Sequence, residues 1–142
     1  MLVYLLVSLG SAIGGCLRYA IGRVLLPDCS GCFPWSTFVI NILGSFIIGY
    51  FGTLTVVGSR AEVPETLRIF VMVGLCGGFT TFSAFSLQTF DLLREGEWTR
   101  ALTNVVLSVL LSIFAVALGH YLAQPISYSV AIAQTQEEEY TG

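Results

Sequence analysis

The sequence predicts an all-α membrane protein with four transmembrane helices. Only 11% of its 142 residues are charged and 55% are hydrophobic, whereas an ordinary soluble domain is roughly 25% charged. Four stretches are long and apolar enough to cross a hydrocarbon core about 30 Å thick, and only short polar joints separate them. So few charges could not cover the surface of a soluble fold, so a soluble enzyme is not expected.

The first apolar stretch, residues 2–17, carries no charge, and its pattern continues to residue 26 across Arg18 and Arg23. A secretory signal peptide would carry a basic leader before the apolar run, and none is present here. Three further spans follow, so this stretch is interpreted as a retained helix.

The second stretch is charge-free over residues 29–59, with its apolar centre at 35–57. The third covers residues 69–90 and the fourth residues 101–123. Together the spans form one four-helix transmembrane domain, residues 1–123. The remainder, 124–142, is rich in polar residues and ends near three consecutive glutamates, so we expect a solvated, flexible tail.

Charge places limits on partners and orientation. The six basic residues are all arginine and the net charge is −3, which argues against nucleic-acid binding because that requires a basic face. Four spans put Arg60 and Arg68 on one membrane face and the other four arginines on the opposite face. Arg18 can lie within the membrane, and without it three arginines lie on one face and two on the other. So weak a bias permits insertion in both directions and an antiparallel dimer.

Two cysteines, Cys29 and Cys32, form a C-x-x-C pair in the first joint, which is typical of a redox pair or half of a metal site. Zinc needs four ligands, and the only histidine, His120, is far along the chain. A membrane thiol oxidoreductase therefore stays as an alternative, although incidental loop cysteines explain the pattern better.

Polar residues recur every four positions on the second and fourth spans, and therefore share one face of each helix. Each can donate a hydrogen bond and none is charged; they are Thr37, Asn41, Ser45, Asn104, Ser108 and Ser112. Such residues often join membrane helices, but two stripes in so small a protein also suggest a polar track. No acidic residue lies in the apolar part of a span, which disfavours a small multidrug exporter. Neutral donors with Arg18 nearby suit an anion better.

Small residues recur at the same spacing, as in Gly10-x-x-x-Gly14, Ser11-x-x-x-Gly15 and Ser45-x-x-x-Gly49. This spacing lets membrane helices approach closely. The spacing predicts a compact bundle or a tight dimer and does not indicate a particular function.

The third span carries Gly77-Gly78 followed by Thr80-Thr81, which weakens a continuous helix and frees backbone carbonyls. Broken helices in a membrane are tolerated where they line a cavity or bind an ion, and oxygen ligands favour small hard cations. Phe82 and Phe85 share a face if the helix resumes there. The positive edges of their rings can face an anion.

The combined motifs resemble the Fluc (CrcB) family of bacterial fluoride channels over about residues 2–123. The matching segments are Gly10-x-x-x-Gly14-x-x-x-Arg18-Tyr19, Thr37-x-x-x-Asn41-x-x-Gly44-Ser45-Phe46 and Gly77-Gly78-Phe79-Thr80-Thr81-Phe82-Ser83. The resemblance implies an antiparallel, dual-topology homodimer in the bacterial inner membrane, with two pores that export fluoride passively.

The resemblance also implies a structural sodium ion, held by the backbone carbonyls of Gly77 and Thr80 from both subunits. Arg18 would lie near a vestibule that collects anions. The implied pore residues are Asn41, Thr81, Phe82, Ser83, Phe85, Ser108 and Ser112. Asn104 stands where some relatives carry a tyrosine, so the resemblance gives it no role.

Three alternatives stay open at this stage: the small-molecule exporter, the thiol oxidoreductase that uses Cys29 and Cys32, and a purely structural assembly role. The exporter lacks its intramembrane acid, and the structural role leaves the stripes of donors without a purpose.

Overall fold

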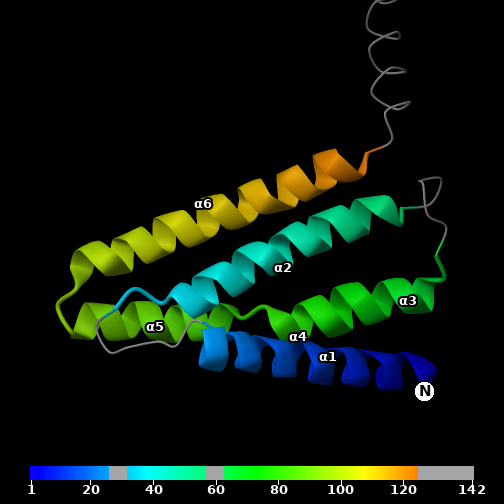
Figure 1. Cartoon of the computed structure of the whole chain (residues 1–142), viewed down its shortest axis with the longest axis horizontal. Helices are drawn as coiled ribbons and strands as arrows, with labels where there is room; N and C mark the ends of the chain where they lie inside the picture. The colour runs from blue at the N-terminus through cyan, green and yellow to red at the C-terminus, as the bar shows by residue number, and fades with distance from the viewer. Residues whose placement is uncertain (26–31, 57–62, 125–142) are drawn as a thin grey trace, which may run out of the picture.

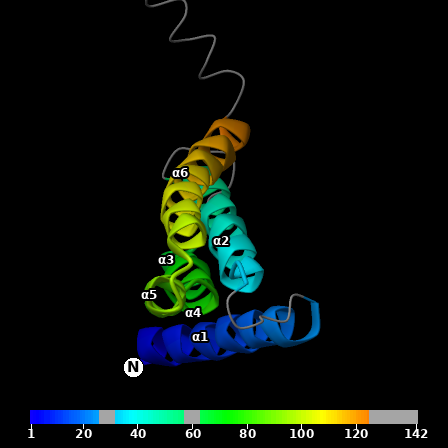
Figure 2. The ribbon, with the colours of Figure 1, turned by 90° about the vertical axis from the view of Figure 1, so that its left-hand side faces the viewer.

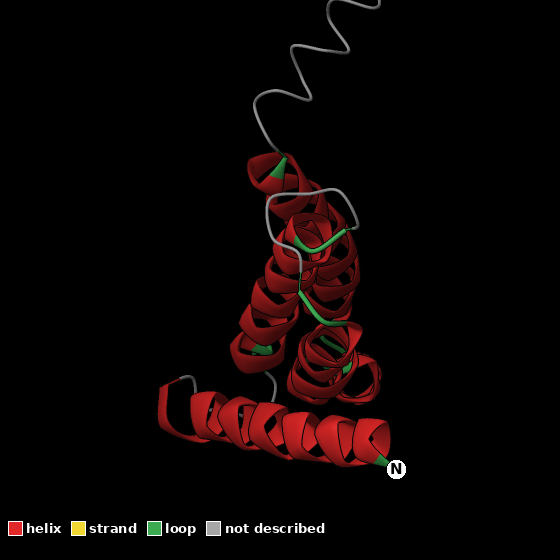
Figure 3. Cartoon of the chain, turned by 90° about the vertical axis from the view of Figure 1, so that its right-hand side faces the viewer, coloured by secondary structure: helices red, strands yellow, loops and turns green. Residues whose placement is uncertain are grey.

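The computed structural model describes residues 1–25, 32–56 and 63–124. Every regular element in these ranges is helical (Figure 3). Four helices are long and apolar enough to cross a membrane: Leu2–Val24, Trp35–Leu54, Glu65–Arg94 and Trp98–Ala123. This confirms the predicted all-helical architecture of four spans. The predicted tail, apart from residue 124, lies outside the described residues.

Two of the spans are single helices that pack side by side. Helix α2 (Trp35–Leu54) and helix α6 (Trp98–Ala123) run next to each other along most of their length (Figure 1). Gly49 and Gly119 lie at this contact. A Cβ atom on Gly119 would stand 2.5 Å from the Phe46 carbonyl oxygen, and one on Gly49 would collide with the carbonyl of Val116. The small residues therefore allow close backbone contact between the two helices.

The first span consists of α1 (Leu2–Ala20) and a short π-helical continuation, η1 (Ile21–Leu25). It packs against the third span and crosses beneath the rest of the molecule (Figure 2). Gly10 and Gly14 are its two buried residues. Gly14 meets the backbone of Leu75 and Phe79 so closely that a side chain would not fit. The expected packing role of the Gly10-x-x-x-Gly14 pair is thus confirmed.

The third span is divided into four pieces. It begins as α3 (Glu65–Ile69), widens into a π-helical segment, η2 (Phe70–Cys76), and ends its first half with the single turn α4 (Gly77–Phe79). After two extended residues it resumes as α5 (Phe82–Arg94), which packs against α6. A π-helical segment within an α-helix is uncommon and often accompanies a functional site.

Burial is inverted relative to a soluble protein. Asn104 is only 1% exposed and Ser36, Thr37 and Ser108 are also buried, whereas apolar side chains such as Leu110, 59% exposed, cover the outside. An apolar exterior suits lipid contact, while buried polar groups need partners inside the bundle. The stripes of donors therefore point inward, as the sequence predicts.

We predict that Gly14→Ala lowers the free energy of unfolding by about 1–3 kcal/mol, because the new methyl group forces α1 away from the third span. Thermal unfolding of the purified protein in detergent measures this loss. Gly15→Ala is the matched control, since a Cβ atom there meets no described atom within 4 Å. We expect it to keep the parent's stability or to gain up to about 1 kcal/mol, because alanine favours a helix more than glycine does, and equal losses in the two variants would contradict the packing model.

Candidate functional site

The site forms around the interruption between α4 and α5. Thr80 has ψ of 160° and Thr81 has φ of −154° and ψ of 112°, so both residues are extended rather than helical. The Thr81 hydroxyl accepts a hydrogen bond of 3.1 Å from the Ala84 N–H and thereby caps the start of α5. The Thr80 hydroxyl donates to the Cys76 carbonyl at 2.9 Å, which closes the end of α4.

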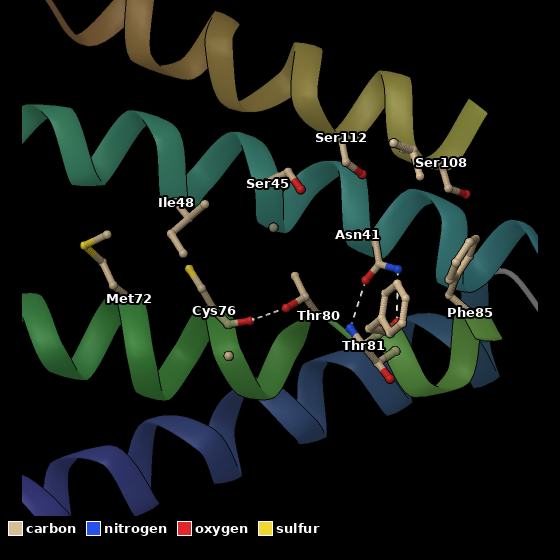
Figure 4. Close-up of a pocket in the computed structure, with 14 residues that line it drawn as sticks. Asn41, Ser45, Ile48, Met72, Cys76, Thr80, Thr81, Phe85, Ser108 and Ser112 are labelled. Atoms are coloured by element: carbon tan, nitrogen blue, oxygen red, sulfur yellow. Dashed lines mark hydrogen bonds between the residues drawn. The ribbon is translucent and has the colours of Figure 1, made fainter. Parts of the chain in front are cut away.

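Asn41 on α2 holds the interruption from the side. Its Oδ1 accepts the N–H of Thr81 at 2.8 Å, and its Nδ2 donates to the carbonyl of Thr81 at 3.1 Å (Figure 4). One amide side chain therefore satisfies both backbone groups of a residue that has left the helix. Without it, these groups would be unpaired among apolar surroundings, at a cost of about 1–3 kcal/mol each.

The interruption leaves several backbone carbonyls between Gly77 and Thr80 without their usual helical donors. In an α-helix a carbonyl accepts from the N–H four residues later. The carbonyl of Gly77 loses this partner because the Thr81 N–H donates to Asn41. The carbonyl of Thr80 loses it because the Ala84 N–H donates to the Thr81 hydroxyl. Among the carbonyls freed at the interruption, the resemblance assigns these two to sodium, and carbonyl oxygens are suitable ligands for a hard cation.

Gly77 lies at an open part of the surface. A Cβ atom there would meet no described atom within 4 Å, and both Gly77 and Thr80 line the adjoining cavity. The backbone at this point is therefore accessible to an ion or to a second chain.

A cavity of about 380 Å³ lies between α2, the interruption and α6. Its lining contains hydroxyl, amide and apolar groups and no charged side chain. The lining residues are Asn41, Gly44, Ser45, Ile48, Met72, Cys76, Gly77, Thr80, Thr81, Phe82, Phe85, Ser108, Val109 and Ser112. Neutral donors beside aromatic rings can bind an anion without the strong retention of a full positive charge.

The aromatic pair lies at one end of this cavity. The ring centroids of Phe82 and Phe85 are 5.5 Å apart and their planes are inclined by 44°. Phe85 is half-buried and lies beside Ser108 (Figure 4). Phe82 is 77% exposed within the single chain. The two rings share one face of α5, as their spacing predicts.

Six of the seven residues predicted for the pore line this cavity, whereas Ser83 and the residue predicted for the vestibule, Arg18, do not. Ser83 does not line the cavity; its hydroxyl lies 3.2 Å from the Thr81 hydroxyl and supports the start of α5. Arg18 is partly buried, and its Nε has no hydrogen-bond partner in the described part of the chain. It does not line the cavity, so its vestibule role stays a prediction.

The lining includes residues that sequence reasoning did not assign to the site. Ile48, Met72, Cys76 and Val109 are apolar or weakly polar, and such residues in a membrane span carry no distinctive signal. Ser45 was visible only as part of its stripe. Thr37, at the start of that stripe, is buried away from the cavity.

The cysteine pair is described only in part. Cys32 is disulfide-bonded, and Cys29 lies outside the described residues. Cys16 and Cys76 are free thiols on helices. Among the described residues there is no cluster of three or more histidine, cysteine or acidic side chains that could hold a metal ion.

Comparison with known proteins covers most of the chain. Residues 5–120 match the family model described as "CrcB-like protein, Camphor Resistance (CrcB)". A protein of Paramagnetospirillum magneticum named fluoride-specific ion channel FluC is 56% identical over 89% of this chain and 99% of its own length. Proteins of the same name from Methylobacterium radiotolerans and Gluconobacter oxydans are each 52% identical, over 95% of this chain and 94% of their own lengths.

Proposed function

The chain belongs to the CrcB family, and from this premise we propose that it is a fluoride-selective channel that lets fluoride leave the cell and so relieves its toxicity. It is a multi-pass membrane protein, and we place it in the bacterial inner membrane. Conduction is passive, so the protein is a channel rather than an enzyme. The observation that carries the proposal is the uncharged cavity lined by hydroxyl groups, an amide and two phenyl rings.

Fluoride is small and strongly hydrated, so a pore must replace its water shell with other positive groups. The hydroxyls of Ser112 and Thr81 and the second amide hydrogen of Asn41 are neutral donors in this cavity, and Ser108 adds a further hydroxyl group to its lining. The edges of Phe82 and Phe85 add weak positive charge. None of these groups is ionised, so fluoride can leave again, and the membrane potential drives it out of a negative interior.

The active assembly in this proposal is an antiparallel, dual-topology homodimer in the lipid bilayer, with two pores. The 77% exposure of Phe82 supports it, because a second chain would cover a ring that the single chain leaves at the cavity's edge. The weak arginine asymmetry of the loops is compatible with both orientations.

We further propose a structural sodium ion at the dimer axis, with fluoride as the only transported ion. The carbonyls of Gly77 and Thr80 would hold it, and each has lost its helical donor. Two carbonyls from each chain give four oxygen ligands, which suits a small hard cation. Bound in this way, sodium neutralises carbonyl dipoles at the interruption and ties the two chains together.

Fluoride efflux from liposomes tests the channel directly. We expect the purified protein to release fluoride and no chloride, and Phe82→Ile to slow fluoride release at least about tenfold because the positive ring edge is lost. A fluoride electrode and a chloride electrode follow the two anions. Cys32→Ser is the control, expected to leave the rate unchanged. Equal release of both anions would reject the proposal, and loss of function in Cys32→Ser would favour the thiol oxidoreductase.

Sodium removal tests the structural ion separately. We expect protein assembled in sodium-free buffer, with N-methylglucamine as the cation, to lose most of its dimer, because the carbonyls then repel one another across the axis. Crosslinking in lipid measures the dimer fraction, and readdition of sodium should restore it. An unchanged dimer fraction without sodium would contradict this site, whatever the outcome of the efflux assay.

A further inference from the structure

Asn104 is the most deeply buried large side chain in the described part of the molecule. It lies on α6 one turn before Ser108, is 1% exposed, and does not line the cavity. An amide buried in this way must have its hydrogen bonds made inside the protein. Asn104 therefore cannot touch an ion in the cavity, and its effect must pass through its partners.

Asn104 and its partners form a chain of hydrogen bonds in which each group donates to the next, from Ser108 through Asn104 to Thr89. The Thr89 hydroxyl donates to the Phe85 carbonyl at 2.7 Å, so its oxygen acts as an acceptor toward Asn104. The Asn104 Nδ2 donates to that oxygen at 2.8 Å. This turns the amide oxygen toward Ser108, whose hydroxyl donates to it at 3.1 Å.

The consequence concerns Ser108, the member of this chain whose hydroxyl lines the cavity. A serine hydroxyl has one hydrogen, and here that hydrogen is given to Asn104. Toward the cavity, Ser108 then presents only oxygen lone pairs, which repel an anion. Ser108 can donate to fluoride only after its hydrogen has left Asn104.

A half-turn of the Asn104 amide group solves this problem at small cost. It exchanges Oδ1 and Nδ2, so the nitrogen donates to Ser108 and the Thr89 hydroxyl donates to the amide oxygen. The bond that is given up is the one from the Thr89 hydroxyl to the Phe85 carbonyl, and this carbonyl lies within α5 where the helix already provides a donor. Ser108 also becomes a stronger donor, because it now accepts a hydrogen bond.

We propose that Asn104 is a positioning residue that sets the direction of the Ser108 hydroxyl, and that its amide reverses when fluoride enters the cavity beside Ser108. This inference rests on the proposed fluoride function. The buried amide of Asn104 thereby acts in anion binding without contacting the anion.

A double-mutant cycle in liposomes tests it. We expect Asn104→Leu and Ser108→Ala each to slow fluoride efflux about tenfold, the equivalent of one hydrogen bond. The double variant should be no slower than either single variant, because Asn104 acts only through Ser108. If Asn104 served only to pack α5 against α6, the losses would multiply to about a hundredfold, and that result would overturn the proposal, as would an unchanged rate in Asn104→Leu.

A spectroscopic readout follows the amide itself. In protein labelled with ¹⁵N at asparagine, the side-chain resonance that disappears in Asn104→Leu should shift on addition of fluoride and not of chloride; an unshifted resonance would overturn the proposal. If Asn104→Leu does not assemble, Thr89→Val takes its place in the cycle with the same expected outcome. Absence of fluoride efflux from the parent protein would instead reject the proposed function.

Discussion

The structure depends on one interaction, the paired hydrogen bonds between the Asn41 amide and the backbone of Thr81. A helix in apolar surroundings cannot simply stop, because its freed N–H and C=O groups have no water to bind. Asn41 takes the place of the missing helical partners at one residue. The Thr81 hydroxyl then starts the next helix, so the interruption is built from two side chains and needs no charge.

The functional features follow from this arrangement. Diverting the N–H groups of Thr81 and Ala84 frees the carbonyls of Gly77 and Thr80. Restarting the helix at Phe82 sets both phenyl rings on one face, beside the hydroxyls of α6. The cavity therefore combines donors, ring edges and free carbonyls without an ionised group. Such a site can replace the water of a small anion and still release it.

The sequence predicts those parts of the structure that depend on local hydropathy and residue spacing. Hydropathy predicts the four spans. The spacing of Asn41, Ser108 and Ser112 predicts which face of the second and fourth spans points inward. The glycine pair suggests a weak helix, yet the helix continues through Gly77–Phe79 and yields at Thr80 and Thr81. The position of the interruption depends on Asn41, which is forty residues from Thr81 in the sequence. A local sequence pattern around Thr81 does not contain this partner. The same holds for Asn104, whose direction is set by Thr89 on another helix.

The role of the Asn41 amide is tested most directly by the free energy of unfolding of Asn41→Leu in detergent, compared with that of Ser45→Ala one turn along the same helix face. Leucine keeps the volume and removes both hydrogen bonds to Thr81. We expect a loss of about 2 kcal/mol or more for Asn41→Leu, because two partly buried backbone groups become unpaired. We expect a change within about 0.5 kcal/mol for Ser45→Ala. Equal stability of the two variants would contradict the claim that this amide holds the interruption.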